Sequence, residues 1–239
     1  LRTLIHKTKF KKVYDLQNSS RTSFYRRFLF DIKNWSSTQT TLKKGDTKDN
    51  FDTNSVLARF QHQLEESGVI TENTLKPNFS WACENVDNIV SKYFSGNFIL
   101  LFPFCSPNLP HKKWPYFQEL IQIIKSKHNN LEVVIAPGPN EIEESKKFNA
   151  TVVLNQSQAL NMMELSGLIK KSKFVIANDT GPAHISAHLG KSGVALFGSH
   201  TSPKKVSIET ENFKTLISKK LENLSAEKVY FAIKDKLII

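Results

Sequence analysis

The sequence predicts an α/β protein whose larger part is a doubly wound domain with a parallel sheet. Two observations carry this prediction. From residue 97 onward, short apolar runs alternate with segments whose apolar residues recur every three or four positions, as strands alternate with helices. The first of these runs, Phe98–Phe102, is apolar throughout, which is typical of a parallel strand covered on both faces.

The first 96 residues are less regular. Residues 12–16 predict a short strand, and residues 20–30 predict a helix that mixes phenylalanine with arginine. Residues 36–54 are polar and predict a loop. Residues 56–67 place their apolar side chains on one helix face, and Gly68 is a usual residue for a helix end. Residues 71–84 predict a linker, and residues 86–94 predict a short helix.

The alternating part predicts six strands separated by helices. The strands are expected at residues 98–102, 131–136, 151–154, 174–177, 194–197 and 214–217. The helices are expected at 115–127, 140–147, 160–171 and 226–237, with a further one that follows residues 178–184 and ends at residue 189. Strands joined in this way by helical crossovers pair in parallel.

Composition excludes several classes of protein. Apolar residues make up 39% of the 239 residues, which is too many for a disordered polyelectrolyte, and no apolar run approaches the ~20 residues of a membrane span. The two cysteines provide no disulfide framework, so a reducing compartment is expected. The chain begins with Leu1 and no signal-peptide pattern follows, so we expect the natural N-terminus to be missing.

The net charge of +11 is unevenly distributed. Residues 1–50 contain 12 of the 33 lysines and arginines but only four of the 22 acidic residues. Such a basic segment suits nucleic acid, an anionic membrane or an acidic small molecule, and a solvated basic surface explains it equally well.

Ligands of a doubly wound sheet bind outside the carboxyl ends of its strands. The loop at residues 178–184 (NDTGPAH) follows such a strand, and Asp179 or Thr180 can cap the helix after it. Gly181 permits close approach to the backbone, Pro182 suits the first helical turn, and His184 can donate to a phosphate. An ordinary capped helix with a packed histidine is the alternative.

Two further loops follow strands. Residues 103–115 (PFCSPNLPHKKWP) carry Lys112 close to a helix start, where a bound phosphate would relieve its repulsion by the helix dipole. A solvated lysine beside a core tryptophan is equally compatible with this loop. Residues 198–203 (GSHTSP) offer small hydrogen-bond donors to a ligand, but an ordinary polar turn is the favoured interpretation. Glu164, at the start of the 160–171 helix, suits either a helix cap or a contact to a sugar or base. No cluster has metal-ligand spacing.

Three segments together resemble glycosyltransferase family 9, the ADP-heptose:lipopolysaccharide heptosyltransferases. The first is FVIANDTGPAHISAHLGKSGVALFGSHTSP at residues 174–203. The second is FILLFPF with the following HKKWP, and the third is YDLQNSSRTSFYRRF near the N-terminus. Their order and spacing agree with the family, and they extend from residue 14 to residue 203.

The resemblance implies a GT-B fold with two Rossmann-like domains: a truncated acceptor-side domain with linker at residues 1–84, and a nucleotide-sugar domain at residues 85–239 whose last helix has the option of packing back on the first domain. It implies metal-independent, inverting transfer of a heptose or related sugar from an ADP-sugar to an acidic lipopolysaccharide-core acceptor. This reaction needs no cofactor beyond the donor, and it belongs to the bacterial cytoplasm or the cytoplasmic face of the inner membrane, with no nucleic-acid partner. The implied residues are Lys112 and Asp179 for catalysis, the same two with Thr180, Gly181, Pro182, His184 and Glu164 for the donor, and Arg21 on the acceptor side.

The sequence departs from the family in two respects. The family opens with a strand and a Gly-Asp motif that carries the proposed general base, and nothing here corresponds to it, so we expect the base to lie in a missing N-terminal segment; Asp15 does not replace it. The usual Pro-Gly after the first strand of the nucleotide domain reads Pro103-Phe104. A nucleotide-sugar epimerase of GT-B fold, a donor-binding homologue without transfer activity, and a non-enzymatic basic protein are the alternatives.

Overall fold

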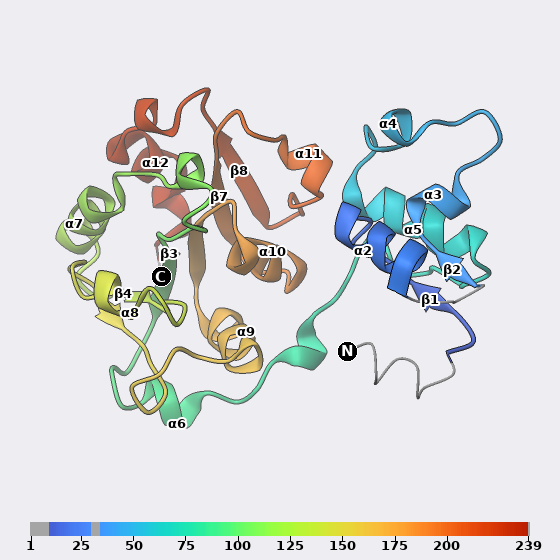
Figure 1. The fold of residues 1–239 in the computed structure, drawn as a ribbon. Helices are drawn as coiled ribbons and strands as arrows, with labels where there is room; N and C mark the ends of the chain where they lie inside the picture. Colours follow the sequence, from blue (N-terminus) through green and yellow to red (C-terminus); the bar gives the residue numbers. More distant parts are fainter. Residues whose placement is uncertain (1–9, 30–33, 239) are drawn as a thin grey trace. The chain divides into compact units, whose positions relative to one another are not determined.

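The computed structural model describes residues 10–29 and 34–238 (Figure 1). The chain forms two compact units. Unit 1 contains the residues up to Pro77 together with residues 205–207, and unit 2 contains the rest of the chain. The boundary between the units therefore precedes the predicted one at residue 84.

Unit 2 is built on a parallel sheet of six strands in the order β5-β4-β3-β6-β7-β8. The strands are β3 (Phe98–Phe102), β4 (Glu132–Ile135), β5 (Thr151–Val152), β6 (Phe174–Asn178), β7 (Gly193–Phe197) and β8 (Phe213–Ile217). All six strands point the same way. In sequence order, β4 and β5 are added on one side of β3, and β6, β7 and β8 are added on its other side, which is the strand order of the Rossmann fold. The switch point of the topology therefore lies between β3 and β6, where Leu101 pairs with Ile176.

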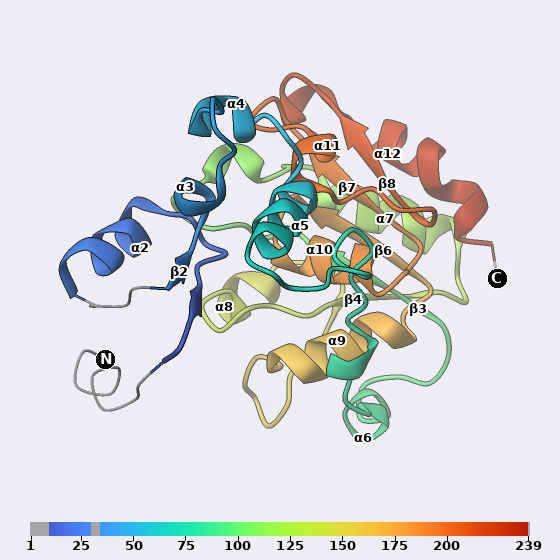
Figure 2. The same cartoon turned by 90° about the vertical axis from the view of Figure 1, so that its right-hand side faces the viewer.

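Helices cover both faces of this sheet (Figures 1 and 2). One face carries α7 (Phe117–Lys127) and α12 (Ala226–Ile233), whose Leu120, Ile121 and Val229 pack with Ile99 and Leu101 in one buried cluster. The other face carries α9 (Met162–Lys171) and α10 (Gly181–His188). Coverage on both faces explains why every residue of β3, β6 and β7 is buried, as the continuous apolar runs predict.

The remaining elements of unit 2 are short. They are η2 (Ser80–Ala82), α6 (Asp87–Val90), η3 (Pro110–Lys112), α8 (Ile142–Ser145), η4 (Leu221–Asn223) and η5 (Lys234–Lys236). The helix α11 (Pro203–Val206) begins in unit 2, and its last two residues belong to unit 1. The closing helix α12 packs against α7, where the Tyr230 hydroxyl lies 3.1 Å from His128 Nε2. The helix α12 thus contributes to the core of unit 2, and its packing against the first domain stays a prediction.

Unit 1 contains two parallel strands and a set of short helices. They are β1 (Val13–Tyr14), α2 (Ser20–Phe24), the π-helical η1 (Tyr25–Leu29), β2 (Trp35–Ser36), α3 (Thr38–Thr41), α4 (Lys48–Phe51) and α5 (Val56–Glu66). Gln63 on α5 is fully buried, and its side-chain amide donates to the backbone oxygens of Asp15 and Ser36. One buried amide thus joins the helix to β2 and to the residue directly after β1.

The predicted loop at residues 36–54 is wrong, because it contains α3 and α4. Neither helix has an apolar period, and both depend on capping. Ser37 and Thr40 form a reciprocal capping box, and the Thr47 hydroxyl accepts the N–H of Asn50. The helix predicted at residues 20–30 begins as α2 and continues as the π-helical η1, while residue 30 lies outside the described residues.

Within the described residues, no helix combines the length and the apolar character needed to cross a membrane.

Candidate active site

The candidate site lies at the carboxyl ends of three neighbouring strands. The loop after β3 carries Lys112 on η3, the loop after β6 begins with Asp179, and the loop after β7 contains His200. Because β3, β6 and β7 are adjacent in the sheet, these side chains meet although the chain separates Lys112 from Asp179 by 67 residues. The site therefore occupies the switch point at which ligands of this fold are expected to bind.

Asp179 is the centre of the cluster. Its side chain is only 2% exposed, and its Oδ2 accepts from Lys112 Nζ at 2.7 Å and lies 2.8 Å from His200 Nε2. Its Oδ1 lies 3.5 Å from His184 Nε2. Lys112 itself is 20% exposed, so the amine joins a buried carboxylate to a surface that a ligand can reach.

The surroundings of Asp179 keep it ionised. Burial alone would raise the pKa of this carboxyl, but hydrogen bonds from His184, Lys112 and His200 outweigh burial and hold the pKa well below its usual range. Asp179 therefore carries a full negative charge near neutral pH. That charge holds the Lys112 ammonium at the end of the sheet.

Asn178 fixes the backbone that carries Lys112. This side chain is fully buried, and its Oδ1 accepts the N–H of Trp114 at 3.0 Å while its Nδ2 donates to the Pro103 oxygen at 2.9 Å. The amide thus binds both ends of the 103–114 loop. Trp114 is buried as the sequence predicts, and its indole N–H donates to the Leu224 oxygen at 2.6 Å.

The start of α10 is open to a ligand. Thr180 occupies the N-cap position, but its hydroxyl makes no capping hydrogen bond and instead lies 3.4 Å from the Asn178 oxygen. Pro182 stands in the first turn, where its missing N–H costs nothing. A Cβ added to Gly181 would meet no atom within 4 Å. The first turn therefore combines a helix dipole, an uncapped end and free space beside the backbone.

A cavity of about 270 Å³ opens beside this helix start. Thr180 and Pro182 contribute to its wall, together with residues of the 103–115 loop and residues elsewhere for which the sequence predicts no ligand contact. These are Phe102, Phe104, Cys105, Ser106, Ala136, Pro137, Gly138, Pro139, Glu141, Leu160, Met162 and Leu165. Pro137 directly follows the strand predicted at residues 131–136, and this position was the signal that could have found the wall, although the sequence Pro-Gly-Pro by itself is typical of an ordinary turn.

Glu141 is the one acidic side chain among the residues that line this cavity. Its Oε2 accepts the N–H of Gly138 at 2.8 Å, which holds the carboxylate against the loop that follows β4. A carboxylate fixed in this manner suits hydroxyl groups of a sugar, because an ionised carboxylate accepts several hydrogen bonds.

Glu164 forms the helix cap that was one of its two predicted roles. Its Oε2 accepts the N–H of Asn161, and its Oε1 accepts from Asn155 Nδ2 at 2.6 Å. Together with the Asn161 side chain this makes a reciprocal capping box at the start of α9. A contact of Glu164 with a donor stays a prediction.

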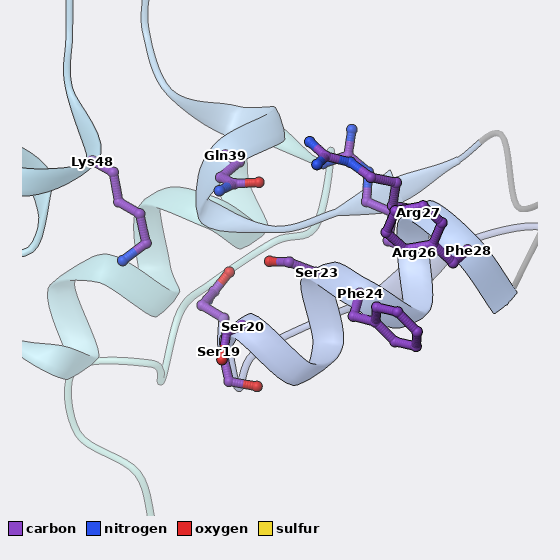
Figure 3. A pocket seen from close by; sticks show the side chains of 10 residues that line it. Ser19, Ser20, Ser23, Phe24, Arg26, Arg27, Phe28, Gln39 and Lys48 are labelled. Carbon is purple, nitrogen blue, oxygen red and sulfur yellow. The ribbon is translucent and has the colours of Figure 1, made fainter.

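Unit 1 has a cavity of its own, of about 930 Å³. Figure 3 shows Lys48 at one end, the hydroxyls of serine residues in the middle, and Arg26 and Arg27 beyond them. Lys48 is paired with Asp52 at 2.6 Å, whereas no described carboxylate lies within ion-pairing distance of either arginine. The predicted acceptor-side residue Arg21 is exposed on α2, and the lining of the cavity contains Arg26 and Arg27 instead.

Among the described residues, no group of three or more histidine, cysteine, aspartate or glutamate side chains is arranged to hold a metal ion. The cluster around Asp179 contains one carboxylate and two imidazoles, and its carboxylate is paired with the Lys112 ammonium.

A Rossmann-like unit with this site at its switch point is the architecture of a nucleotide-binding α/β protein, and comparison with known proteins specifies it. The family model for glycosyltransferase family 9 (heptosyltransferase) matches residues 5–230, so the chain belongs to this family. No curated protein sequence matches the chain.

Solved structures show the GT-B heptosyltransferase fold. The chain is similar to E. coli heptosyltransferase WaaC with ADP, with a TM-score of 0.67, 17% identity, and coverage of 98% of this chain and 75% of that one. E. coli ADP-heptose lps heptosyltransferase II gives a TM-score of 0.69, 16% identity, and coverage of 99% and 80%. The glycosyl transferase family 9 protein of Veillonella parvula gives 0.66, 17%, and coverage of 99% and 76%. WaaC has also been solved with ADP-2-deoxy-2-fluoro heptose.

Proposed function

We propose that the chain is a glycosyltransferase that binds an ADP-sugar in unit 2 and transfers its sugar to an acidic acceptor. One observation carries the proposal: the Lys112 ammonium is held by Asp179 at the carboxyl ends of β3 and β6, beside the uncapped start of α10. A lysine and a helix N-terminus that converge on one point form a binding site for a diphosphate.

The cavity beside α10 is the proposed position of the nucleoside. Its wall is largely apolar, which suits a base, and Glu141 offers a carboxylate to the ribose hydroxyls. Thr180 and Pro182 belong both to this wall and to the start of α10, so a nucleoside in the cavity places its phosphates at the helix N-terminus. Support for ADP comes from the E. coli heptosyltransferase WaaC, which was solved with it.

The proposed chemistry is displacement at the anomeric carbon. The oxygen of an acceptor hydroxyl attacks this carbon and gives up its proton to a general base or to water. The bond from the carbon to the diphosphate oxygen breaks, and its electron pair stays on the departing diphosphate. Lys112 and the N-terminal end of α10 stabilise the charge that develops there, which is the role that a divalent cation plays in other enzymes. Attack opposite the leaving group inverts the configuration of the sugar.

Unit 1 is the proposed acceptor side. Arg26 and Arg27 line its cavity without a described carboxylate partner, so their charge is available to a phosphorylated or carboxylated acceptor. Arg21 lies exposed on the same helical segment and adds to this charge. Asp15 is not a candidate for the general base, because its Oδ1 accepts the N–H of Asn18 and its side chain is buried.

The identity of the sugar and acceptor follows the family. A heptose donor and a lipopolysaccharide-core acceptor are proposed, which would place the protein in the bacterial cytoplasm, with reversible contact of its basic first unit with the anionic inner membrane. This part is supported by the family match and by the net charge of residues 1–50.

Calorimetry with ADP tests the donor site. Wild-type protein should bind ADP, and Lys112→Ala should bind about 10- to 100-fold more weakly, the amount expected for one charge-assisted hydrogen bond to a phosphate. Lys113→Ala is the matched control, because Lys113 is the neighbouring lysine but pairs with Glu144 at 2.5 Å. Absence of ADP binding, or equal loss in the two variants, contradicts the donor site. EDTA should leave both binding and transfer unchanged.

A further inference from the structure

We infer that His200 is a positioning residue of the donor site: it controls how firmly Asp179 holds Lys112. The inference rests on the proposed binding of a diphosphate by Lys112. His200 comes from the 198–203 loop, for which the sequence favours a polar turn, and neither the motif nor the proposed donor contacts assign it a role.

The geometry shows competition for one oxygen. Lys112 Nζ at 2.7 Å and His200 Nε2 at 2.8 Å share Asp179 Oδ2. Because an ionised carboxylate can only accept, the ring donates from Nε2. Its Nδ1 is buried and has no hydrogen-bond partner among the described residues. The hydrogen bond to Asp179 is therefore the polar contact that orients this ring.

Packing holds the ring in place for this contact. The imidazole stacks on Phe197, with ring planes 11° apart and centroids separated by 6.0 Å, and the His111 ring lies 5.3 Å away on another loop. The His200 side chain is 11% exposed. A side chain fixed this well donates to the carboxylate whether Lys112 is present or absent.

The consequence appears when a diphosphate binds. The Lys112 ammonium must then weaken or give up its contact with Asp179 in order to bind the phosphate. A carboxylate buried to 2% exposure is costly to leave without donors, and His200 and His184 are the donors that remain. Without His200, Asp179 would retain Lys112 more strongly and the amine would be less available to the ligand.

The first arm of the test needs no ligand. In the intact protein, acetylation of Lys112 is followed by mass spectrometry, with Lys146, which is paired with Glu143 elsewhere on unit 2, as internal reference. His200→Leu should slow the labelling of Lys112 relative to Lys146 severalfold, because the amine is held more tightly. His200→Gln, whose amide can also donate, should label like wild type. Equal labelling of Lys112 in His200→Leu and wild type would overturn the inference.

The second arm measures ADP affinity. His200→Leu should weaken ADP binding about tenfold, and His200→Gln should stay within about twofold of wild type. In a Lys112→Met background His200→Leu should have no further effect, because the two residues act through one carboxylate. An undiminished effect in that background would overturn the inference. Failure of wild type to bind ADP would instead reject the proposed donor site, while the labelling arm still judges His200.

A second histidine variant separates positioning from folding. His128→Leu removes the 3.1 Å contact to the Tyr230 hydroxyl at the end of α7, which leads into the amino end of β4 and so lies at the other end of the strands from the site. It should lower thermal stability without changing Lys112 labelling. If His200→Leu changed Lys112 labelling only to the extent that it lowered stability, and His128→Leu did the same, the role of His200 would be structural and the inference wrong.

Discussion

The Asn178 amide offers the sharpest test of how the Lys112 loop is held. In Asn178→Asp, Oδ1 can still accept the Trp114 N–H, but the second oxygen replaces a donor and faces the Pro103 carbonyl oxygen from 2.9 Å and the Phe104 carbonyl oxygen from 3.4 Å. One buried hydrogen bond becomes a repulsion. The side chain is fully buried, so water cannot compensate.

The magnitude follows from these contacts. Leaving a buried carbonyl unsatisfied costs about 1–3 kcal/mol, and burying a carboxylate among carbonyl oxygens adds to this, so we expect a loss of about 3 kcal/mol at pH 7. The same surroundings raise the pKa of the introduced carboxyl above its unfolded value. A protonated carboxyl can again donate, and the folded state binds this proton more tightly than the unfolded state does. The variant should therefore recover stability as pH falls toward the unfolded value near 4.

Chemical denaturation at pH 7 and pH 5 measures this effect, and hydrogen exchange of the Trp114 amide reports on the loop itself. Wild type and variant should differ less at pH 5 than at pH 7, and Trp114 should exchange faster in the variant. Asn149→Asp is a matched control at an exposed position. A loss below about 0.5 kcal/mol, or a loss independent of pH, would refute the assignment of Asn178 as the residue that anchors the loop.

Four further outcomes are expected. The lowered folded-state pKa of Asp179 means that its contribution to stability is complete above the unfolded value near 4 and is lost as pH falls below it, so Asp179→Asn should flatten the acid limb of a denaturation series between about pH 4 and pH 2. Gly181→Ala should keep the free energy of unfolding within about 0.5 kcal/mol of wild type yet weaken ADP binding, whereas Gly167→Ala, whose Cβ would meet a backbone oxygen at 2.0 Å, should lose about 2 kcal/mol or more of that free energy; a stability loss at Gly181 would contradict the open helix start. Cys105 lines the nucleoside cavity and burial raises the pKa of its thiol, so maleimide should react slowly with it and more slowly still with ADP present, while Cys83 shows no ADP effect; equal rates with and without ADP would place the nucleoside elsewhere. Incubation with an ADP-sugar alone should yield no epimerised sugar, and accumulation of an epimer without acceptor would favour the epimerase alternative.

The sheet could be predicted almost completely from the sequence. The runs at 98–102 and 174–177 are apolar throughout because helices cover both faces of the sheet, and this pattern does not depend on how the individual side chains pack. The prediction that ligand-binding loops follow the strands also follows from topology, and it led to Lys112 and Asp179. Their direct contact at 2.7 Å agrees with that reasoning.

The parts of the site that sequence reasoning missed depend on tertiary contacts, whereas the missed helices depend on local capping. Glu141 and the 137–139 turn become a cavity wall only because β4 lies beside β3 in the sheet. In the sequence, His200 cannot be distinguished from an ordinary polar turn residue. Its contact with Asp179 exists because β7, which precedes His200, pairs with β6, which precedes Asp179. The helices α3 and α4 have four residues each and no apolar period, so local capping by side-chain hydroxyls decides them.

The position of the site within the sheet also bears on how the protein folds and opens. The cluster draws on β3, β6 and β7, which are interior strands, whereas β5 and β8 form the edges. Fraying of the two-residue edge strand β5 would leave the cluster of Lys112, Asp179 and His200 intact. Separation of β3 from β6 would dismantle it, and that pairing joins segments more than 70 residues apart in sequence. We therefore expect ligand-binding competence to appear late in refolding and to be lost only with the global unfolding of unit 2.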